Sequence, residues 1–216
     1  MKRFIFLLVF SLMIFPPKEF SQVIISDSPF ISGAVGAMSF TTGDNRNSQS
    51  TLSFAFSSSF GVPVIDNLFI YGRVTYSSVE NFSGYFNEIQ LNENISAVNM
   101  LQLANASFSQ LIFNAGLLYR LKVTDEFHTG LSGGVTYSIL NHEAYLQNEK
   151  IISELNNEGV YGYFGGVMLE RKITSENLSL FAEAQYNYIK SDAVYFRRAF
   201  SGMNYTFGIR YFFSNR

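Results

Sequence analysis

The sequence predicts an all-β protein, a closed antiparallel up-and-down transmembrane β-barrel of eight strands. The first observation behind this prediction is that apolar side chains recur at every second position in segment after segment, and successive side chains on a strand face opposite sides. The second is a short apolar segment at the N-terminus, typical of an exported chain. The third is that no helical layer accompanies these segments to cover their apolar faces. We therefore expect these faces to meet lipid while the polar faces line the inside of the barrel.

The N-terminus has the organisation of a signal peptide. A basic pair precedes an unbroken apolar run over residues 4–15, and two prolines end any helix there. This run is too short for a membrane helix, which needs roughly 20 residues, but has the length of the apolar core of a signal peptide. We expect a signal peptide over residues 1–21, with cleavage after Ser21, and one barrel domain over residues 22–216. A retained N-terminal anchor is the alternative.

The composition excludes several other classes of protein. Cysteine is absent, which argues against a disulfide-stapled scaffold and against thiolate chemistry. Without residues 1–21 the chain has 12 basic and 16 acidic residues, a formal charge of −4, so it is no polybasic nucleic-acid-binding protein. The chain holds 23 Phe and 13 Tyr, and tyrosines near the strand ends fit the aromatic belts of the two membrane interfaces.

The first three strands are predicted at residues 30–42, 51–61 and 68–79. Small residues in the first strand blur its alternation and leave its facing open. In the other two strands, large apolar side chains alternate with small or polar ones. Their outward positions are Leu52, Phe54, Phe56 and Phe60 in the second strand and Leu68, Ile70, Gly72, Val74 and Tyr76 in the third.

The next three strands are predicted at residues 107–123, 127–141 and 158–173. Each alternates in the same way, with glycine, serine, threonine, asparagine or charged residues at most of the inner positions. The outward positions are Leu111, Phe113, Ala115, Leu117, Tyr119 and Leu121; then Leu131, Val135, Tyr137 and Ile139; and then Tyr161, Tyr163, Val167 and Leu169.

The last two strands, predicted at residues 178–190 and 205–213, alternate most cleanly. A loop over residues 191–198 comes before the eighth strand. One face of each strand is wholly apolar and aromatic, while most of the other face is small or polar. The outward positions are Leu178, Leu180, Ala182, Ala184, Tyr186 and Tyr188, and then Tyr205, Phe207, Ile209, Tyr211 and Phe213.

The connections alternate between short and long. Short turns follow the second, fourth and sixth strands, and longer loops follow the others. Short periplasmic turns, longer extracellular loops and an even number of strands are typical of bacterial outer-membrane barrels. We therefore expect an outer-membrane location, both termini in the periplasm, and outer loops at residues 80–106 and 142–157.

Two other architectures remain open at this point. An even number of strands lets the first strand close against the last and removes the unpaired edges that lipid cannot satisfy. A hairpin within residues 80–106 would raise the number of strands to ten. A soluble β-sandwich or lipocalin-like barrel is the non-membrane alternative, but it does not explain why so many strands share an apolar face opposite a polar one.

The secretion signal, the eight alternating strands, FAEAQYNYI in the seventh strand and YTFGIRYFF at the end resemble the OmpA/OmpX-type outer-membrane β-barrel domain family. The resemblance covers residues 25–213. It implies a small, monomeric outer-membrane barrel whose last strand is recognised by the barrel-insertion machinery. The insertion signal would be the outward face of that strand: Tyr205, Phe207, Ile209, Tyr211 and Phe213. Three further residues, 214–216, follow Phe213, whereas the final strand of this family often ends on an aromatic residue.

Five charged residues are predicted to face the lumen. They are Arg73, Arg120, Glu170, Glu183 and Arg210. The interior of an eight-stranded barrel is only just filled by side chains, and an unpaired charge there is costly. We expect a salt-bridge network that plugs the lumen together with aromatic side chains, with Glu183 and Arg210 paired. A path for protons or ions through these residues is the alternative.

Catalysis is not expected. His128 opens the fifth strand, and His142 stands beside Glu143, with Ser153 and Glu154 in the same predicted loop region. Polar neighbours of this kind arise by chance in any loop, and phosphate-binding glycine loops, HExxH spacing and metal-ligand clusters are absent from the sequence. We expect no enzyme activity, no cofactor and no metal.

Two classes of function follow. The first is a structural or surface-interaction barrel that supports envelope integrity or adhesion through residues 80–106 and 142–157. The second is a passage or carrier barrel for a small hydrophobic molecule, which the apolar parts of residues 80–106 would admit. A lipid-modifying outer-membrane enzyme is a third and weaker alternative. The contents of the lumen separate the first two: paired charges and aromatic rings favour the first class, and an apolar cavity favours the second.

Overall fold

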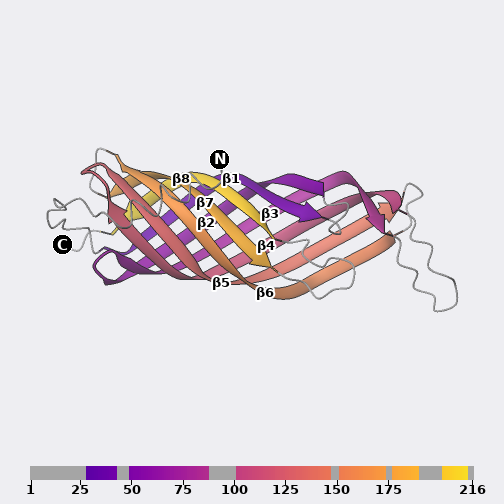
Figure 1. Ribbon diagram of the computed structural model, residues 1–216, viewed down its shortest axis with the longest axis horizontal. Coiled ribbons are helices and arrows are strands. Elements are labelled where there is room, and N and C mark those ends of the chain that lie inside the picture. Colours follow the sequence, from indigo (N-terminus) through magenta and orange to yellow (C-terminus); the bar gives the residue numbers. More distant parts are fainter. Residues whose placement is uncertain are drawn as a thin grey trace, which may run out of the picture.

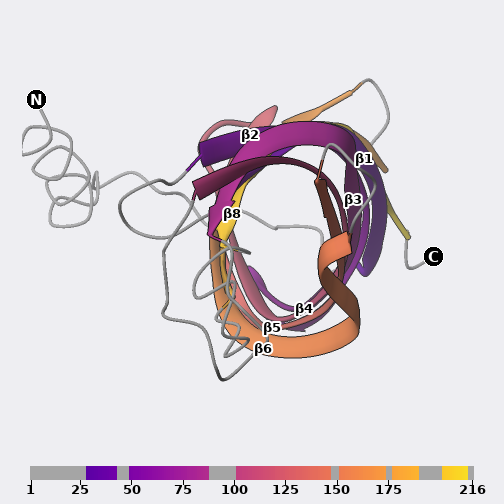
Figure 2. The ribbon, with the colours of Figure 1, turned by 90° about the vertical axis from the view of Figure 1, so that its right-hand side faces the viewer.

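The chain forms a closed barrel of eight strands in which each strand pairs with its neighbours in sequence (Figures 1 and 2). The computed structural model describes residues 28–42, 49–87, 101–146, 151–173, 177–189 and 201–213. The strands are β1 (Phe30–Thr42), β2 (Gln49–Ile65), β3 (Leu68–Asn87), β4 (Leu101–Lys122), β5 (Phe127–Leu146), β6 (Ile151–Lys172), β7 (Leu178–Ile189) and β8 (Gly202–Phe212). The predicted fold class and the number of strands are confirmed. The predicted signal peptide, its cleavage site and residues 214–216 lie outside the described residues.

All strand pairs are antiparallel, and β1 closes the barrel against β8. The closing ladder runs from the pair Phe30 and Phe212 to the pair Met38 and Asn204. This closure satisfies the backbone groups that a strand edge would otherwise expose, which is a requirement for any sheet within lipid. No helix in the residues that the structure describes has the length and apolar character to cross a membrane.

The two ends of the barrel differ. At one end, here called the short-turn end, β2 joins β3, β4 joins β5 and β6 joins β7. At the other, the hairpin end, β3 to β6 reach far beyond the remaining strands and lie at the right of Figure 1. These four strands hold 20 to 22 residues, against 12 in β7 and 11 in β8.

The extended hairpins correct the predicted loops at residues 80–106 and 142–157. The pairing of β3 with β4 continues, past an irregularity after Val79, to Asn87 and Leu101, and that of β5 with β6 continues to Tyr145 and Ile151. Outside a membrane, strand pairing needs backbone hydrogen bonds but no apolar face, so the alternation that marks membrane strands is missing there. The first hairpin prolongs β3 and β4 and adds no strand to the barrel, so the ten-strand alternative is wrong.

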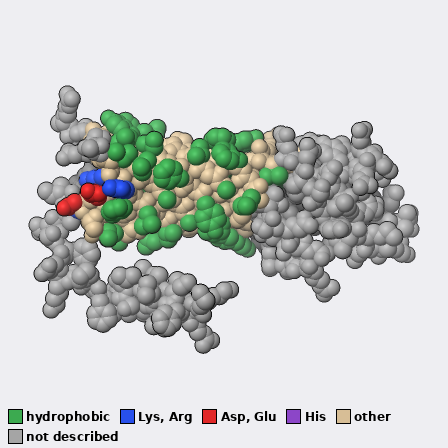
Figure 3. Space-filling view, turned by 90° about the horizontal axis from the view of Figure 1, so that it is seen from above, with side chains coloured by type: hydrophobic (Ala, Val, Ile, Leu, Met, Phe, Trp, Pro, Cys, Tyr) green, Lys and Arg blue, Asp and Glu red, His purple; other side chains and the backbone are tan. Residues whose placement is uncertain are grey.

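The predicted facing of β2 to β8 is confirmed by the exposure of the side chains. In β2, Phe56 is 55% exposed whereas Ala55 is 0% exposed, and the same contrast recurs along the other strands. The facing of β1, which the sequence left open, is now defined: Ile31 and Val35 point outward, and Phe30 and Met38 are buried inside. Figure 3 shows apolar side chains spread along the described outer wall, with charged side chains gathered at the short-turn end.

Aromatic rings border the outer wall toward both ends. Toward the hairpin end, the rings of Tyr137 and Tyr161 lie 4.9 Å apart, and Tyr163 of β6 pairs with Tyr188 of β7. At the short-turn end, the rings of Tyr211 and Phe213 contact edge to face at 5.4 Å. Such girdles are typical of membrane barrels because an amphipathic ring is favourable at the interface between lipid and water.

Candidate functional site

The lumen collects the polar side chains that the strands turn away from the outer wall. The five charged residues predicted to face inward all do so, on β3, β4, β6, β7 and β8, and each is at most 6% exposed. They form two separate clusters rather than one network. The pairing expected between Glu183 and Arg210 does not occur.

The first cluster, here called the Glu170 cluster, lies toward the short-turn end. Both carboxylate oxygens of Glu170 accept from arginine: Nη2 of Arg120 lies 2.5 Å from Oε1, and Nη1 of Arg210 lies 2.5 Å from Oε2. The hydroxyl of Ser179 donates a third hydrogen bond to Oε1 at 2.9 Å. Two guanidinium groups therefore share one carboxylate, so these side chains carry a net charge of about +1 in the interior.

Aromatic rings stack against the guanidinium groups of this cluster and stabilise its remaining positive charge. The guanidinium carbon of Arg210 lies 4.1 Å from the ring centre of Phe30 and 4.8 Å from that of Phe181, and that of Arg120 lies 4.7 Å from the ring of Phe212. The face of an aromatic ring is negative and attracts a cation, more strongly where water is excluded. These stacks matter because two nitrogens on each guanidinium have no hydrogen-bond partner among the described residues.

A glycine makes room for one of these rings. The ring of Phe30 lies against Gly61 of β2, where a Cβ atom would collide with it. Phe30 also contacts the rings of Phe69 and Phe212, with ring centres 5.6 and 5.7 Å apart. The short-turn end of the lumen is thus closed by an aromatic layer wrapped around the charges.

The second cluster, here called the Arg73 cluster, pairs Nη1 of Arg73 with Oε2 of Glu183 at 3.0 Å. The guanidinium also donates to four neutral oxygens, which belong to Ser57, Thr75, Gln185 and Thr206, at 2.9 to 3.3 Å. The side-chain charges of this cluster sum to zero. The guanidinium of Arg73 has five partners, one carboxylate and four neutral oxygens. This is the arrangement in which a buried ion pair is tolerated.

The register explains why Glu183 does not reach Arg210. On β8, Thr206 lies opposite Glu183, whereas Arg210 lies opposite Ser179, four residues away along β7. Four residues on a strand span about 13 Å. The sequence shows that both residues face inward, but the offset between two strands depends on the ladder that forms.

Amide and hydroxyl side chains fill the next level toward the hairpin end. Asn114 donates to Thr136 at 2.7 Å and to Asn187 at 3.0 Å, and Gln185 donates to Asn114 at 3.1 Å. Beyond this level apolar and polar side chains share the inward positions: Leu140, Val160 and Ile189 are at most 6% exposed, and the buried Gln110, opposite Leu140, donates to Ser138 at 2.8 Å. Paired charges, then amides, then a mixture of apolar and polar groups therefore follow one another along the described lumen.

The residues weighed for catalysis lie in the ladder between β5 and β6. His128 is buried and lies opposite Glu170 in the ladder between β5 and β6. His142 lies opposite Leu155, while Ser153 lies opposite Ala144 and Glu154 opposite Glu143. No group of three residues able to hold a metal occurs among the described residues. At the turn between β4 and β5, Lys122 holds the pKa of the Asp125 carboxyl below its usual range, from a distance of 2.5 Å.

The sequence predicted aromatic side chains in the plug but did not identify the rings that contact the charges. Phe30, Phe181 and Phe212 surround the Glu170 cluster, but the sequence prediction gave them no role there. A signal was present for Phe212, an aromatic residue at an inward position of β8, two residues after Arg210. An aromatic ring at an inward position close to an arginine is the feature that could have revealed the stacking.

Solved structures with the same architecture are small outer-membrane barrels. The neisserial surface protein A shares 16% identity with a TM-score of 0.52, and the match covers 85% of this chain and 97% of that one. OprG of Pseudomonas aeruginosa shares 14% with a TM-score of 0.52, over 88% and 98% of the two chains. Ail, the attachment invasion locus protein of Yersinia pestis, shares 12% with a TM-score of 0.51, over 86% and 99%. No family model and no curated protein matches the sequence. The fold is that of small eight-stranded outer-membrane β-barrels, which confirms the resemblance at the level of the fold.

Proposed function

We propose that this protein is a bacterial outer-membrane barrel with a closed lumen, which acts as a structural or surface-interaction element of the cell envelope. The observation that carries the proposal is the filling of the lumen. The five predicted inward charges lie in two clusters with carboxylate, hydroxyl, amide or aromatic partners, and an amide layer and a layer of mixed apolar and polar side chains follow them. A solute could cross only if these contacts were broken, so the filled lumen favours this function over a passage.

The outer wall supports the membrane location. In the isolated chain, large apolar side chains stay exposed on every strand except β7. The outward face of β7 adds two tyrosines and small residues. In water such a surface would be a large hydrophobic patch, whereas in a bilayer it meets acyl chains. By the usual arrangement of these barrels, the short-turn end faces the periplasm together with both termini, and the extended hairpins face outward.

The hairpins are the proposed contact surface for a partner outside the cell. They are formed by β3–β4 and β5–β6, which extend well beyond the barrel wall. The protein is proposed to work as a monomer, without cofactor and without catalysis. The outward face of β8, whose large side chains are 44 to 56% exposed, is the proposed signal for the barrel-insertion machinery, and residues 1–21 are the proposed export signal.

Three measurements test this proposal. The processed protein should fractionate with outer membranes and migrate differently on gels with and without heating. An epitope inserted after Leu146 should be accessible to antibody on intact cells, whereas the same epitope after Lys172 should be accessible only after the outer membrane is opened. Recovery as a soluble periplasmic protein would overturn the membrane assignment.

Planar-bilayer recordings separate the closed lumen from a passage. The unmodified protein should show no steady conductance. Large and regular channel openings would show that the lumen opens and would support the passage function in place of the structural one.

A further inference from the structure

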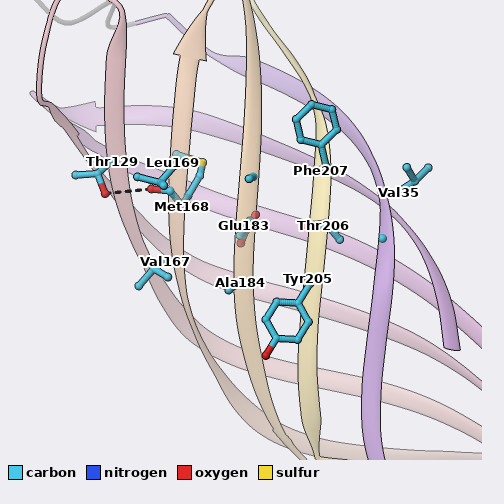
Figure 4. Close-up of a pocket in the computed structure, with 12 residues that line it drawn as sticks. Val35, Thr129, Val167, Met168, Leu169, Glu183, Ala184, Tyr205, Thr206 and Phe207 are labelled. Atoms are coloured by element: carbon cyan, nitrogen blue, oxygen red, sulfur yellow. Dashed lines mark hydrogen bonds between the residues drawn. The ribbon is translucent and has the colours of Figure 1, made fainter. Parts of the chain in front are cut away.

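The outer wall of the barrel is interrupted by a groove of about 630 Å³ over β6, β7 and β8, with an edge on β5 and on β1. Its floor is β7, where the outward residues are Ala182 and Ala184. Val167 and Leu169 of β6 form one wall, and Tyr205 and Phe207 of β8 form the other. Figure 4 shows the two rings of β8 on one side, Val167 on the other and Ala184 between them.

The floor is low because small residues replace large ones at outward positions. Opposite Ala184 in the ladders are Val167 and Tyr205, and opposite Ala182 are Leu169 and Phe207. All four of these opposing side chains are 52 to 67% exposed and stand up from the sheet. The groove therefore follows from the small outward residues of β7.

We propose that this groove holds one lipid acyl chain, which resides there longer than the lipids along the rest of the wall. The proposal rests on the proposed membrane location. The groove faces the bilayer, its walls are apolar, and no charged side chain projects into it from the outward positions of the three strands. Hydrocarbon is the chemistry that such a surface binds.

The width of the groove selects an acyl chain over larger occupants. Its wall strands flank a single strand, so they are about 10 Å apart, and their side chains fill part of that distance. An α-helix with its side chains measures about 10–12 Å and does not fit. A second barrel would touch this convex wall along a narrow strip, well short of the roughly 800 Å² per partner of a standard interface.

The groove also has a direction. Toward the hairpin end the next outward residue of β7 after Ala184 is Tyr186, which lies opposite Gly165 of β6 and is 45% exposed. Tyr163 and Tyr188 come next on the two strands and lie opposite each other. A lipid with its chain in the groove would thus place its polar end among tyrosine hydroxyls, which prefer the interface. The structure assigns the occupant to the leaflet at the hairpin end.

The test uses the full mature protein in phosphatidylcholine vesicles that contain phosphatidylcholine with a nitroxide near the middle of one acyl chain. Electron paramagnetic resonance reports how many lipids per barrel are motionally restricted. Ala184→Phe fills the groove, and Ala115→Phe makes the same change at an exposed outward position of β4, outside the groove. We expect Ala184→Phe to lose one restricted lipid per barrel and Ala115→Phe to lose none.

Ala182→Leu is a second, smaller filling change, in case the phenylalanine variant does not insert, and should give a partial loss. Equal numbers of restricted lipids in the unmodified protein and both groove variants would overturn the proposal. Chemical cross-linking of the vesicles would reveal a dimer that Ala184→Phe dissolves; that result would assign the groove to a second copy and also overturn it. If the unmodified protein did not insert and gave no heat-dependent gel shift, the proposed function itself would fail, a result distinct from an inserted barrel without a seated lipid.

Discussion

Replacing Glu170 by glutamine should be the most damaging neutral substitution among the inward charges. The carboxylate serves two buried guanidinium groups at 2.5 Å each, and each of those groups has two nitrogens without another described partner. In Glu170→Gln, one side-chain oxygen remains to accept a hydrogen bond, and the NH₂ group faces the second guanidinium donor against donor. The charge of the cluster rises from about +1 to about +2 in the interior.

The magnitude follows from the geometry. With an effective dielectric constant of about 20, opposite charges about 3 Å apart attract by roughly 5–6 kcal/mol, before the cost of desolvation is subtracted. Removal of one partner from a buried pair is typically measured at about 3–5 kcal/mol. Because Glu170 serves two arginines, we expect Glu170→Gln to lower the free energy of unfolding by about 5 kcal/mol, the upper end of that range.

Glu183→Gln is the matched comparison. It breaks the pair of Glu183 with Arg73, but Arg73 keeps four neutral acceptors around it. We therefore expect a loss nearer the lower end, about 3 kcal/mol. Urea titration of the barrels in vesicles, followed by the gel shift of the folded form, measures both values. A larger loss for Glu183→Gln than for Glu170→Gln would refute the assignment of the shared carboxylate.

Double-mutant cycles test the partners directly. Glu183→Gln combined with Arg73→Gln should cost clearly less than the sum of the two single changes, with a coupling of about 0.5–3 kcal/mol, whereas Glu183→Gln combined with Arg210→Gln should be additive within about 0.5 kcal/mol. Strong coupling between Glu183 and Arg210 would show that the register between β7 and β8 differs from the ladder described above.

Three further changes test other parts of the molecule. Ala184→Arg, on the lipid side of β7, should impair insertion by about 2–4 kcal/mol relative to the neutral control Ala184→Leu, and equal insertion of the two would refute the facing of β7. Gln185→Arg, one residue further, should also be harmful, because it places a second cation beside Arg73 in a filled lumen; measured insertion equal to that of the unmodified protein would contradict the close packing there. Removal of residues 143–156, with the ends joined by Asn-Gly, should keep the heat-dependent gel shift while abolishing any surface binding through this hairpin, and loss of the shift would show that the barrel depends on the extension.

The sequence by itself determined the class of the fold, the number of strands and the facing of seven of them. Each of these depends on a local property, the alternation of side chains along one strand, which lipid on one side and a narrow lumen on the other enforce residue by residue. The sequence did not predict the facing of β1, because its alanines and glycines show no contrast between large apolar and polar side chains. The sequence did not predict the hairpin extensions, because strands in water do not need an apolar face.

Only the tertiary structure decided which inward charges meet. The alternation of side chains predicts that Glu183 and Arg210 face the same side of the sheet. The ladder between β7 and β8 sets them four residues apart, and Arg210 pairs with Glu170 instead. The same holds for Phe30 over Arg210 and for the groove over Ala184, which exist because residues from different strands stand next to each other. Alternation is a property of one strand, whereas register is a property of a pair of strands, and contacts across a barrel depend on the register of all eight.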